Sequence, residues 1–312
     1  MNKYTLREKI EKNLEILNSG LVGKEKVMKL GLLSILSGEN MILVGPPGTA
    51  KSEISRRLRE ILADTDSETY FEYLFTKFTT PEEIFGPLSI KQLQNDKFER
   101  NTEGYMPSSR IVFLDEIFKA NSSILNTLLT ILNERVFHNG LKREKTPLIS
   151  LIGASNELPF ENDELTALYD RFLIRAVVGY VSDDEIEELL DIKETDMEIP
   201  AEIKFIESDL NEIKSESEKV RVTSGIKRTI MQIRQEYNKI FAEDNHEIIS
   251  DRKLVKMVKL LKVSAYLNGR DKVDFSDLML LTNCLWNNPE NLEKVTKLVL
   301  EAVKRNVAKD EE

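Results

Sequence analysis

The sequence predicts an α/β domain built on a parallel sheet, followed by a domain made of helices. Three observations lead to this prediction. Apolar runs of strand length alternate with helical stretches in the first part of the chain, residues 1–182 hold 11 of the 13 glycines and 7 of the 9 prolines, and apolar residues at helical spacing fill the remainder. We therefore expect an α/β domain over residues 1–181 and a helical domain over residues 182–312.

Five apolar or aromatic runs of the first part have the length of a strand. They alternate little with polar residues, which is typical of strands that are buried on both faces of a parallel sheet. Helical stretches such as Lys51–Leu62 and Ser122–Glu134 lie between them. The expected strands are Met41–Val44, Tyr70–Phe75, Ile111–Leu114, Leu148–Ile152 and Phe172–Val178.

The helical part is expected to begin near Ser182, which could cap a helix together with Glu185 three residues later. We expect the acidic stretch Asp183–Glu198 to be a solvated helix face whose apolar side is formed by Ile186, Leu189 and Leu190. Further along, apolar residues recur every three or four positions and predict core-facing stripes. These residues are Leu254, Val258, Leu261 and Ala265, then Leu292, Val295, Leu298, Val299, Ala302 and Val303.

Composition excludes several classes of protein. None of the apolar runs in the 312 residues approaches the roughly 20 residues that cross a bilayer. The segment Met1–Lys12 is charged and lacks the apolar core of a secretory signal, so we expect a cytoplasmic protein without a membrane span. One cysteine and two histidines are too few for a disulfide framework or a Cys/His metal site.

The net charge of −10 is opposite in sign to that of most sequence-independent nucleic-acid binders. Residues 1–182 hold 23 basic and 25 acidic residues, and residues 183–312 hold 21 and 29, so the acidity lies in the second part. We therefore expect no nucleic-acid partner, although the sequence leaves a local basic patch open.

The strongest motif follows the first expected strand and precedes a helix, where it resembles a Walker A phosphate loop. In such a loop the backbone N–H groups cradle phosphate oxygens, Lys51 reaches the β- and γ-phosphates, and the Ser52 hydroxyl binds Mg²⁺. Alanine stands where the strict pattern has glycine before the lysine, and the loop can close around Ala50 if its φ is negative. The loop residues are Gly45, Pro46, Pro47, Gly48, Thr49, Ala50, Lys51 and Ser52.

A second motif, Ile111–Glu116, is an apolar strand that ends in two acids and resembles Walker B. An acid at the tip of a buried strand beside a phosphate loop can hold Mg²⁺, which we assign to Asp115. The next carboxylate can polarise the attacking water, which makes Glu116 the candidate base.

Polar residues at later chain positions complete the candidate site. Asn156 follows the strand that begins at Leu148 and could orient a water against the γ-phosphate, as the residue called sensor 1 does. Arg171 and Arg175 are both candidates for an arginine that reaches a neighbouring subunit's γ-phosphate, and the sequence leaves the choice open.

Together these motifs resemble AAA+ ATPases, and within them the MoxR group, closest to the RavA-type subgroup. Proteins of that subgroup resemble this sequence in that they also accept alanine before the Walker A lysine. The resemblance spans nearly the whole chain and rests on Gly45–Ser52, Phe85–Ser89, Phe113–Ile117, Lys119–Ala120, Ile124–Leu129, Asn133–Arg135, Ala154–Pro159, Ala167–Phe172 and Ser250–Arg252.

The resemblance implies an ATP- and Mg²⁺-dependent ATPase with a core sheet ordered 5-1-4-3-2 and a C-terminal helical lid. It also implies a ring, expected to be a hexamer, with nucleotide between subunits. It implies that Arg171 is the arginine finger, that Arg252 is sensor 2 from the lid, and that Val22 and Gly23 contact adenine. It also implies a protein partner with a von Willebrand factor A domain. RavA-type proteins continue past the lid, whereas this sequence ends at Glu312: it is either truncated or lacks the extra module.

The same family carries an insertion, here about residues 89–107, and a hairpin before sensor 1, here Arg135–Pro147. The pair Asn139–Gly140 independently predicts a tight hairpin turn within the second segment. Their basic residues could line a pore or be ordinary solvated charges: Lys91, Lys97, Arg100, Lys142, Arg143 and Lys145. Two other functions remain alternatives to a chaperone-type ATPase that remodels a protein partner. They are a nucleic-acid motor of the same clade and an ATP-gated scaffold without turnover.

Overall fold

The structure is a computed structural model that describes residues 4–63, 70–159, 163–191, 197–244, 247 and 249–310. It divides into two compact units. The sheet unit comprises Asn13–Phe172 and Ala176–Lys204, and the helical unit comprises Phe205–Glu312 with the short segments Met1–Lys12 and Leu173–Arg175. The domain boundary expected between residues 181 and 182 stays a prediction.

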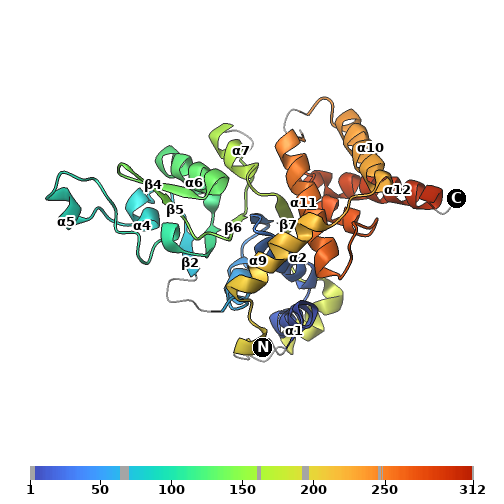
Figure 1. Ribbon diagram of the computed structural model, residues 1–312, viewed down its shortest axis with the longest axis horizontal. Coiled ribbons are helices and arrows are strands. Elements are labelled where there is room, and N and C mark those ends of the chain that lie inside the picture. Colours follow the sequence, from blue (N-terminus) through green and yellow to red (C-terminus); the bar gives the residue numbers. More distant parts are fainter. Residues whose placement is uncertain are drawn as a thin grey trace. The chain divides into compact units, whose positions relative to one another are not determined.

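A five-stranded sheet has the order β2-β3-β6-β1-β7 (Figure 1). Counted along the chain within this sheet, the order is 2-3-4-1-5, which confirms the predicted order 5-1-4-3-2. The printed pairings of β2 with β3, β3 with β6 and β6 with β1 are parallel. The strands are β1 (Met41–Val44), β2 (Tyr70–Leu74), β3 (Ile111–Asp115), β6 (Ser150–Ser155) and β7 (Ile174–Val177).

The central strands are buried because they carry apolar side chains on both faces, as parallel sheets covered by helices require. All four residues of β1 and all six of β6 are buried. Gly153 of β6 leaves room for the ring of Phe172, which lies 3.0 Å from where a Cβ would stand. The helices of this unit are α2 (Glu25–Ser37), α3 (Lys51–Arg59), α4 (Pro81–Phe85), α5 (Ile90–Leu93), α6 (Ser122–Glu134), α7 (Asp163–Tyr169) and α8 (Ile186–Leu190), and α1 (Leu6–Asn18) precedes them.

The strand expected at Leu148–Ile152 is displaced along the chain, since β6 begins at Ser150 and continues to Ser155. Gly153, Ala154 and Ser155 have little intrinsic preference for a strand, so the sequence pattern ends before the strand does. Contacts with other segments of the chain stabilise the strand despite this weak preference. The Ser150 hydroxyl donates to the Glu39 carbonyl oxygen at 2.8 Å, and Gly45 donates its N–H to the Ser155 carbonyl oxygen at 3.1 Å.

The predicted hairpin is formed by β4 (Val136–Asn139) and β5 (Lys142–Lys145), which pair antiparallel. Its turn is one residue later than expected, at Gly140 and Leu141, because Asn139 is the last residue of β4. The Asn139 amide accepts from the Arg100 backbone N at 2.6 Å and donates to the Arg100 carbonyl oxygen at 3.1 Å. The hairpin is therefore attached to the insertion.

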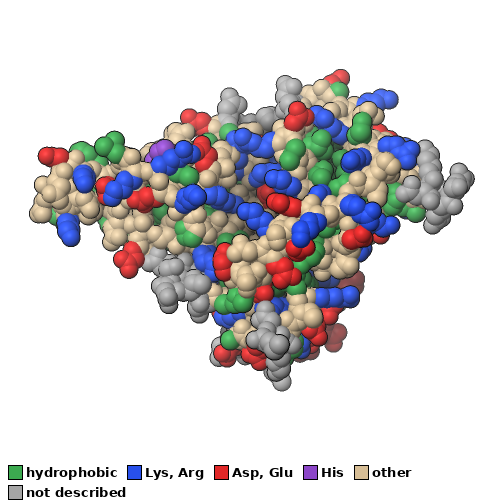
Figure 2. All heavy atoms as spheres, in the orientation of Figure 1, with side chains coloured by type: hydrophobic (Ala, Val, Ile, Leu, Met, Phe, Trp, Pro, Cys, Tyr) green, Lys and Arg blue, Asp and Glu red, His purple; other side chains and the backbone are tan. Residues whose placement is uncertain are grey.

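Three of the six basic residues in the insertion and hairpin form ion pairs: Arg100 with Glu82, Lys142 with Glu99, and Arg143 with Glu134. Apolar side chains are also exposed in these two segments: Ile90 is 75% exposed, Phe98 67% and Leu141 106%. Figure 2 shows apolar side chains at this end of the sheet unit.

The capping box predicted at Ser182 and Glu185 is confirmed, and the two hydroxyl and carboxylate atoms lie 2.7 Å apart. The expected apolar side is wrong, because Ile186, Leu189 and Leu190 are 41%, 43% and 80% exposed. The helix that carries them, α8, has five residues and is too short to bury a face. Residues 192–196 of the acidic stretch lie outside the described residues.

The helical unit is built on four long helices. Six of the ten residues in the two predicted apolar stripes are buried, whereas Leu254, Val258, Leu292 and Val303 are partly exposed. Leu261, Ala265, Val295 and Val299 are at most 1% exposed. The helices are α9 (Glu207–Lys219), α10 (Ser224–Ile240), α11 (Asp251–Leu267) and α12 (Leu292–Asp310). Among the described residues, none of the helices combines the length and apolar character that crossing a membrane requires.

Candidate active site

The phosphate loop joins β1 to α3 at the carboxyl end of the sheet. Gly45 is required at its start, because a Cβ there would lie 2.1 Å from the Val178 carbonyl oxygen. The first N–H groups of any α-helix have no intrahelical acceptor, so those of α3 are available to an anion at the loop. An anion at this loop would therefore meet the N-terminus of α3.

Ala50 adopts the left-handed conformation, with φ 66° and ψ 24°. The expectation that the loop closes with a negative φ at this position is therefore wrong. Ala50 is the N-cap of α3, and the chain must turn there to bring Lys51 into the first helical turn while Gly48, at φ 78°, makes the preceding bend. The Cβ of an L-residue costs about 1–2 kcal/mol in this conformation, so the loop carries strain at the residue before the lysine.

Lys51 is 6% exposed, and its ammonium is held by three oxygens, two from the loop and one from Asn156 at the end of β6. Its Nζ donates to the Gly45 and Pro46 carbonyl oxygens at 2.8 Å each and to Asn156 Oδ1 at 3.0 Å. Burial lowers the pKa of Lys51, and the nearby carboxylates of Asp115 and Glu116 oppose this shift. Lys51 is thus a preorganised cation at the loop.

The two acids at the tip of β3 have different surroundings. Asp115 Oδ1 accepts a hydrogen bond from the Glu116 backbone N at 2.9 Å. Glu116 has φ 52°, another left-handed non-glycine residue, and this conformation directs its side chain toward the end of β6. Backbone strain of this kind often occurs at functional sites.

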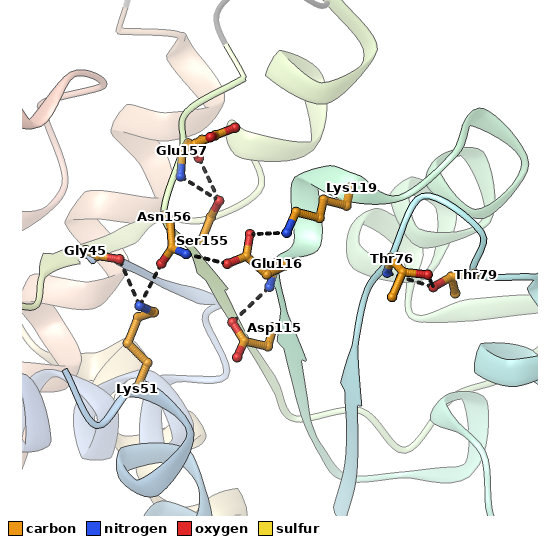
Figure 3. A network of polar contacts seen from close by, with 10 residues as sticks. All are labelled: Gly45, Lys51, Thr76, Thr79, Asp115, Glu116, Lys119, Ser155, Asn156 and Glu157. Carbon is orange, nitrogen blue, oxygen red and sulfur yellow. Dashed lines mark hydrogen bonds and ion pairs between the residues drawn. The ribbon is translucent and has the colours of Figure 1, made fainter. Parts of the chain in front are cut away.

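Figure 3 shows Lys51, Asn156, Glu116 and Lys119 joined in one line of polar contacts. Asn156 Nδ2 donates to Glu116 Oε1 at 2.6 Å, and Lys119 Nζ lies 3.3 Å from Glu116 Oε2. The structure therefore brings together the predicted lysine, base and sensor 1 residue, although they come from three different segments of the chain.

The residues assigned to Mg²⁺ fit that ion by their chemistry. Ser52 is in the first turn of α3 and Asp115 ends β3, and a hydroxyl and a carboxylate are the hard oxygen ligands that Mg²⁺ prefers. Magnesium usually keeps several waters and needs few protein ligands. The part of the chain that the structure describes contains no group of three or more His, Cys, Asp or Glu residues that could hold a metal ion.

The two arginine-finger candidates have different surroundings. Arg175 is fully buried in the helical unit, where its guanidinium donates to the Trp286 carbonyl oxygen and the Asn287 side chain. Arg171 follows α7 in the sheet unit, and its guanidinium pairs with Asp170 at 3.1 Å with 20% of the side chain exposed. A buried guanidinium cannot reach another subunit, so the geometry favours Arg171.

The remaining predicted residues are not part of the network in Figure 3. Val22 is 5% exposed, and Gly23 has φ 66°. Arg252 is exposed in the first turn of α11, in the helical unit, so its role as sensor 2 stays a prediction.

Three residues that contact or adjoin predicted site residues were missed from the sequence. Lys119 contacts Glu116, and its spacing of three residues was an available signal. The Tyr180 hydroxyl donates to the Pro47 carbonyl oxygen at 3.3 Å, and the Glu185 carboxylate lies 3.0 Å from where a Cβ of Gly23 would stand. For the last two contacts, neither motif nor periodicity gave a signal.

Comparison with known proteins matches residues 8–215 to a family described as the MoxR domain in MoxR-vWA-beta-propeller ternary systems, and residues 225–299 to an AAA lid domain. The chain belongs to the MoxR family of AAA+ ATPases. Among its relatives, an uncharacterized protein of Methanocaldococcus jannaschii is 47% identical over 92% of this chain and 74% of its own. The chaperone MoxR1 of Mycobacterium tuberculosis is 27% identical over 54% of this chain and 44% of its own.

A solved structure has the same fold as this MoxR protein. It comes from Cytophaga hutchinsonii, is provisionally named an ATPase, and matches with a TM-score of 0.72 at 19% identity over 96% of this chain and 94% of its own. The predicted family and fold class are confirmed by these matches. The RavA-type subgroup stays a prediction.

Proposed function

We propose that this MoxR protein binds ATP with Mg²⁺ and hydrolyses it. The observation that supports the proposal most is the contact between Asn156 and Glu116 beside Lys51, because a carboxylate, an amide and an ammonium then lie together at one end of the sheet. A phosphate loop alone would support binding only. The added carboxylate and amide are the groups that hydrolysis needs.

In the proposed reaction Lys51 and the loop N–H groups hold the β- and γ-phosphates. Ser52 and Asp115 would hold Mg²⁺, which when bound neutralises phosphate charge. Asn156 orients the water, and Glu116 accepts its proton while the water oxygen bonds to the γ-phosphorus and the bond to the ADP oxygen breaks. Val22 and Gly23 are proposed to contact adenine, and Arg252 to reach the phosphates from the lid.

We further propose that the chain forms a ring, with a hexamer as the expected size, in which Arg171 completes the site of a neighbouring subunit. The exposed part of Arg171 and the burial of Arg175 support this assignment. The test is the mass of the assembly with and without ATP, measured by light scattering, together with its ATPase activity.

The proposed output is remodelling or activation of a protein partner that contains a von Willebrand factor A domain. The description of the matched family, which names vWA and beta-propeller proteins, supports this class of partner. Affinity purification with the Glu116→Gln protein in ATP tests it, since a ring that binds but does not hydrolyse ATP is expected to retain the partner. The cytoplasmic location stays a prediction.

The nucleic-acid motor and the ATP-gated scaffold remain alternatives with their own tests. Single-stranded DNA is expected to leave the ATPase rate unchanged, because the net charge of −10 disfavours a nucleic-acid track. Release of phosphate from ATP in the presence of Mg²⁺, and its loss in EDTA, is expected for the proposed enzyme. A purified protein that binds ATP and releases no phosphate would be the scaffold.

A further inference from the structure

Lys119 is held beside the candidate base by the backbone that follows it. The 3₁₀ turn Ile117–Lys119 begins directly after Glu116, and the Lys119 N–H donates to the Glu116 carbonyl oxygen at 2.9 Å. Ile117 is fully buried and anchors this turn. The left-handed φ of Glu116 and the tight turn together bring the Lys119 ammonium to 3.3 Å from Glu116 Oε2.

Both oxygens of the Glu116 carboxylate therefore have a contact with another side chain. Asn156 Nδ2 donates to Oε1 at 2.6 Å, and Lys119 lies at Oε2. Asn156 Oδ1 accepts a hydrogen bond from Lys51. A phosphate that draws Lys51 and Asn156 toward itself would therefore break the hydrogen bond between Asn156 and Glu116 Oε1. Lys119 contacts neither the loop carbonyls nor Asn156 in the contacts drawn in Figure 3, and its hold on Oε2 does not depend on them.

The exposure of the two side chains separates this pair from an ordinary surface ion pair. Exposed pairs contribute little, because water screens both charges. Here the Glu116 side chain is 14% exposed and that of Lys119 47%, so the carboxylate is largely removed from water, and the Lys119 ammonium forms an ion pair with it. A charge-assisted contact to a half-buried carboxylate is stronger and directional.

We propose that Lys119 is a positioning residue that keeps the Glu116 carboxylate in one orientation when Asn156 turns to the attacking water. This inference rests on the proposed ATP hydrolysis and adds a group to it. The proton of the water passes to Glu116, the water oxygen bonds to the γ-phosphorus, and ADP leaves with the electron pair of the broken P–O bond. Lys119 exchanges no proton and touches no substrate atom.

The test compares Lys119→Ala and Lys119→Arg with Lys29→Ala, which removes an exposed lysine of α2 elsewhere on the sheet unit. Loss of one charge-assisted contact to the base is expected to lower kcat of Lys119→Ala about tenfold while KM for ATP stays within about twofold. Lys119→Arg should retain at least about half of kcat, because a guanidinium preserves the charge. Lys29→Ala should match the parent.

A double variant separates positioning from a general structural effect. In the Glu116→Gln background, Lys119→Ala is expected to change the residual single-turnover rate by less than about twofold, because Lys119 acts only through Glu116. An equal fall in both backgrounds, a change confined to KM, or a parent kcat for Lys119→Ala would overturn the inference. A Glu116→Gln protein with the parent rate would instead reject Glu116 as the base, which is the failure of the proposed function itself.

Discussion

Lys51 Nζ donates a hydrogen bond to Asn156 Oδ1 at 3.0 Å, across 105 positions of the chain. The lysine begins the helix after β1 and the asparagine follows β6, and these two strands pair in parallel. Their carboxyl ends therefore lie together, and this brings Lys51 and Asn156 within hydrogen-bond distance. In the proposed function, a bound nucleotide would replace the contacts of Lys51 with the Gly45 and Pro46 carbonyl oxygens and with Asn156.

Replacement of Ala50 by glycine is expected to stabilise the protein. Its φ of 66° disfavours a residue with a Cβ, so Ala50→Gly should raise the free energy of unfolding by about 0.5–1 kcal/mol after the entropy of the unfolded glycine is counted. Urea denaturation of the nucleotide-free protein measures the change. Ala167→Gly, within α7, is the matched control and should lower stability by about 1 kcal/mol. Destabilisation by both variants would contradict the left-handed conformation at residue 50.

Nucleotide affinity is expected to fall at alkaline pH because burial lowers the pKa of Lys51. As the pH rises through this lowered pKa, Lys51 loses its charge, and phosphate binding must then be accompanied by proton uptake. Calorimetry above about pH 8, where phosphate groups no longer titrate, in buffers of different ionisation enthalpy measures that uptake. Lys51→Arg removes the titrating group. If this variant still takes up the same proton on binding, the proton belongs to a group other than Lys51.

Arg171 and Lys51 are expected to complement each other between subunits. Arg171→Ala should bind ATP and hydrolyse it at least about 10³ times more slowly, as for other arginines that act in trans. Mixing Arg171→Ala with Lys51→Ala subunits should restore part of the activity, because some interfaces then combine an intact loop with an intact arginine. The ATPase rate of mixed assemblies is the measurement. No rescue in rings shown by mass to contain both subunits would reject the trans role.

The fold could be predicted largely because the signals are local. β1 and β3 are continuous apolar runs that need no partner to be recognised, and Asp115 and Glu116 mark the end of a strand in the sequence itself. The phosphate loop lies between such a strand and an amphipathic helix. Neighbouring parallel strands then bring Lys51, Glu116 and Asn156 to one edge, a consequence of topology that the family resemblance supplied.

The features that escaped prediction depend on backbone conformation or distant packing. The φ of Ala50 follows from closure of the whole loop, and the Lys119 contact follows from a 3₁₀ turn that an alternating or helical pattern does not encode. The burial of Arg175 depends on Trp286 and Asn287, 111 and 112 positions away. α8 remained exposed because its length, rather than its pattern, decides what it can bury.

The most direct test of the account is single-turnover ATP hydrolysis by the parent, Glu116→Gln and Lys51→Ala proteins, with ATP binding measured on the same samples. Lys51→Ala should lose binding, because Lys51 contacts bound phosphate before reaction. Glu116→Gln should bind ATP as the parent does and hydrolyse it about 10²–10⁴ times more slowly, the usual contribution of a general base. Hydrolysis by Glu116→Gln at the parent rate would contradict the central claim.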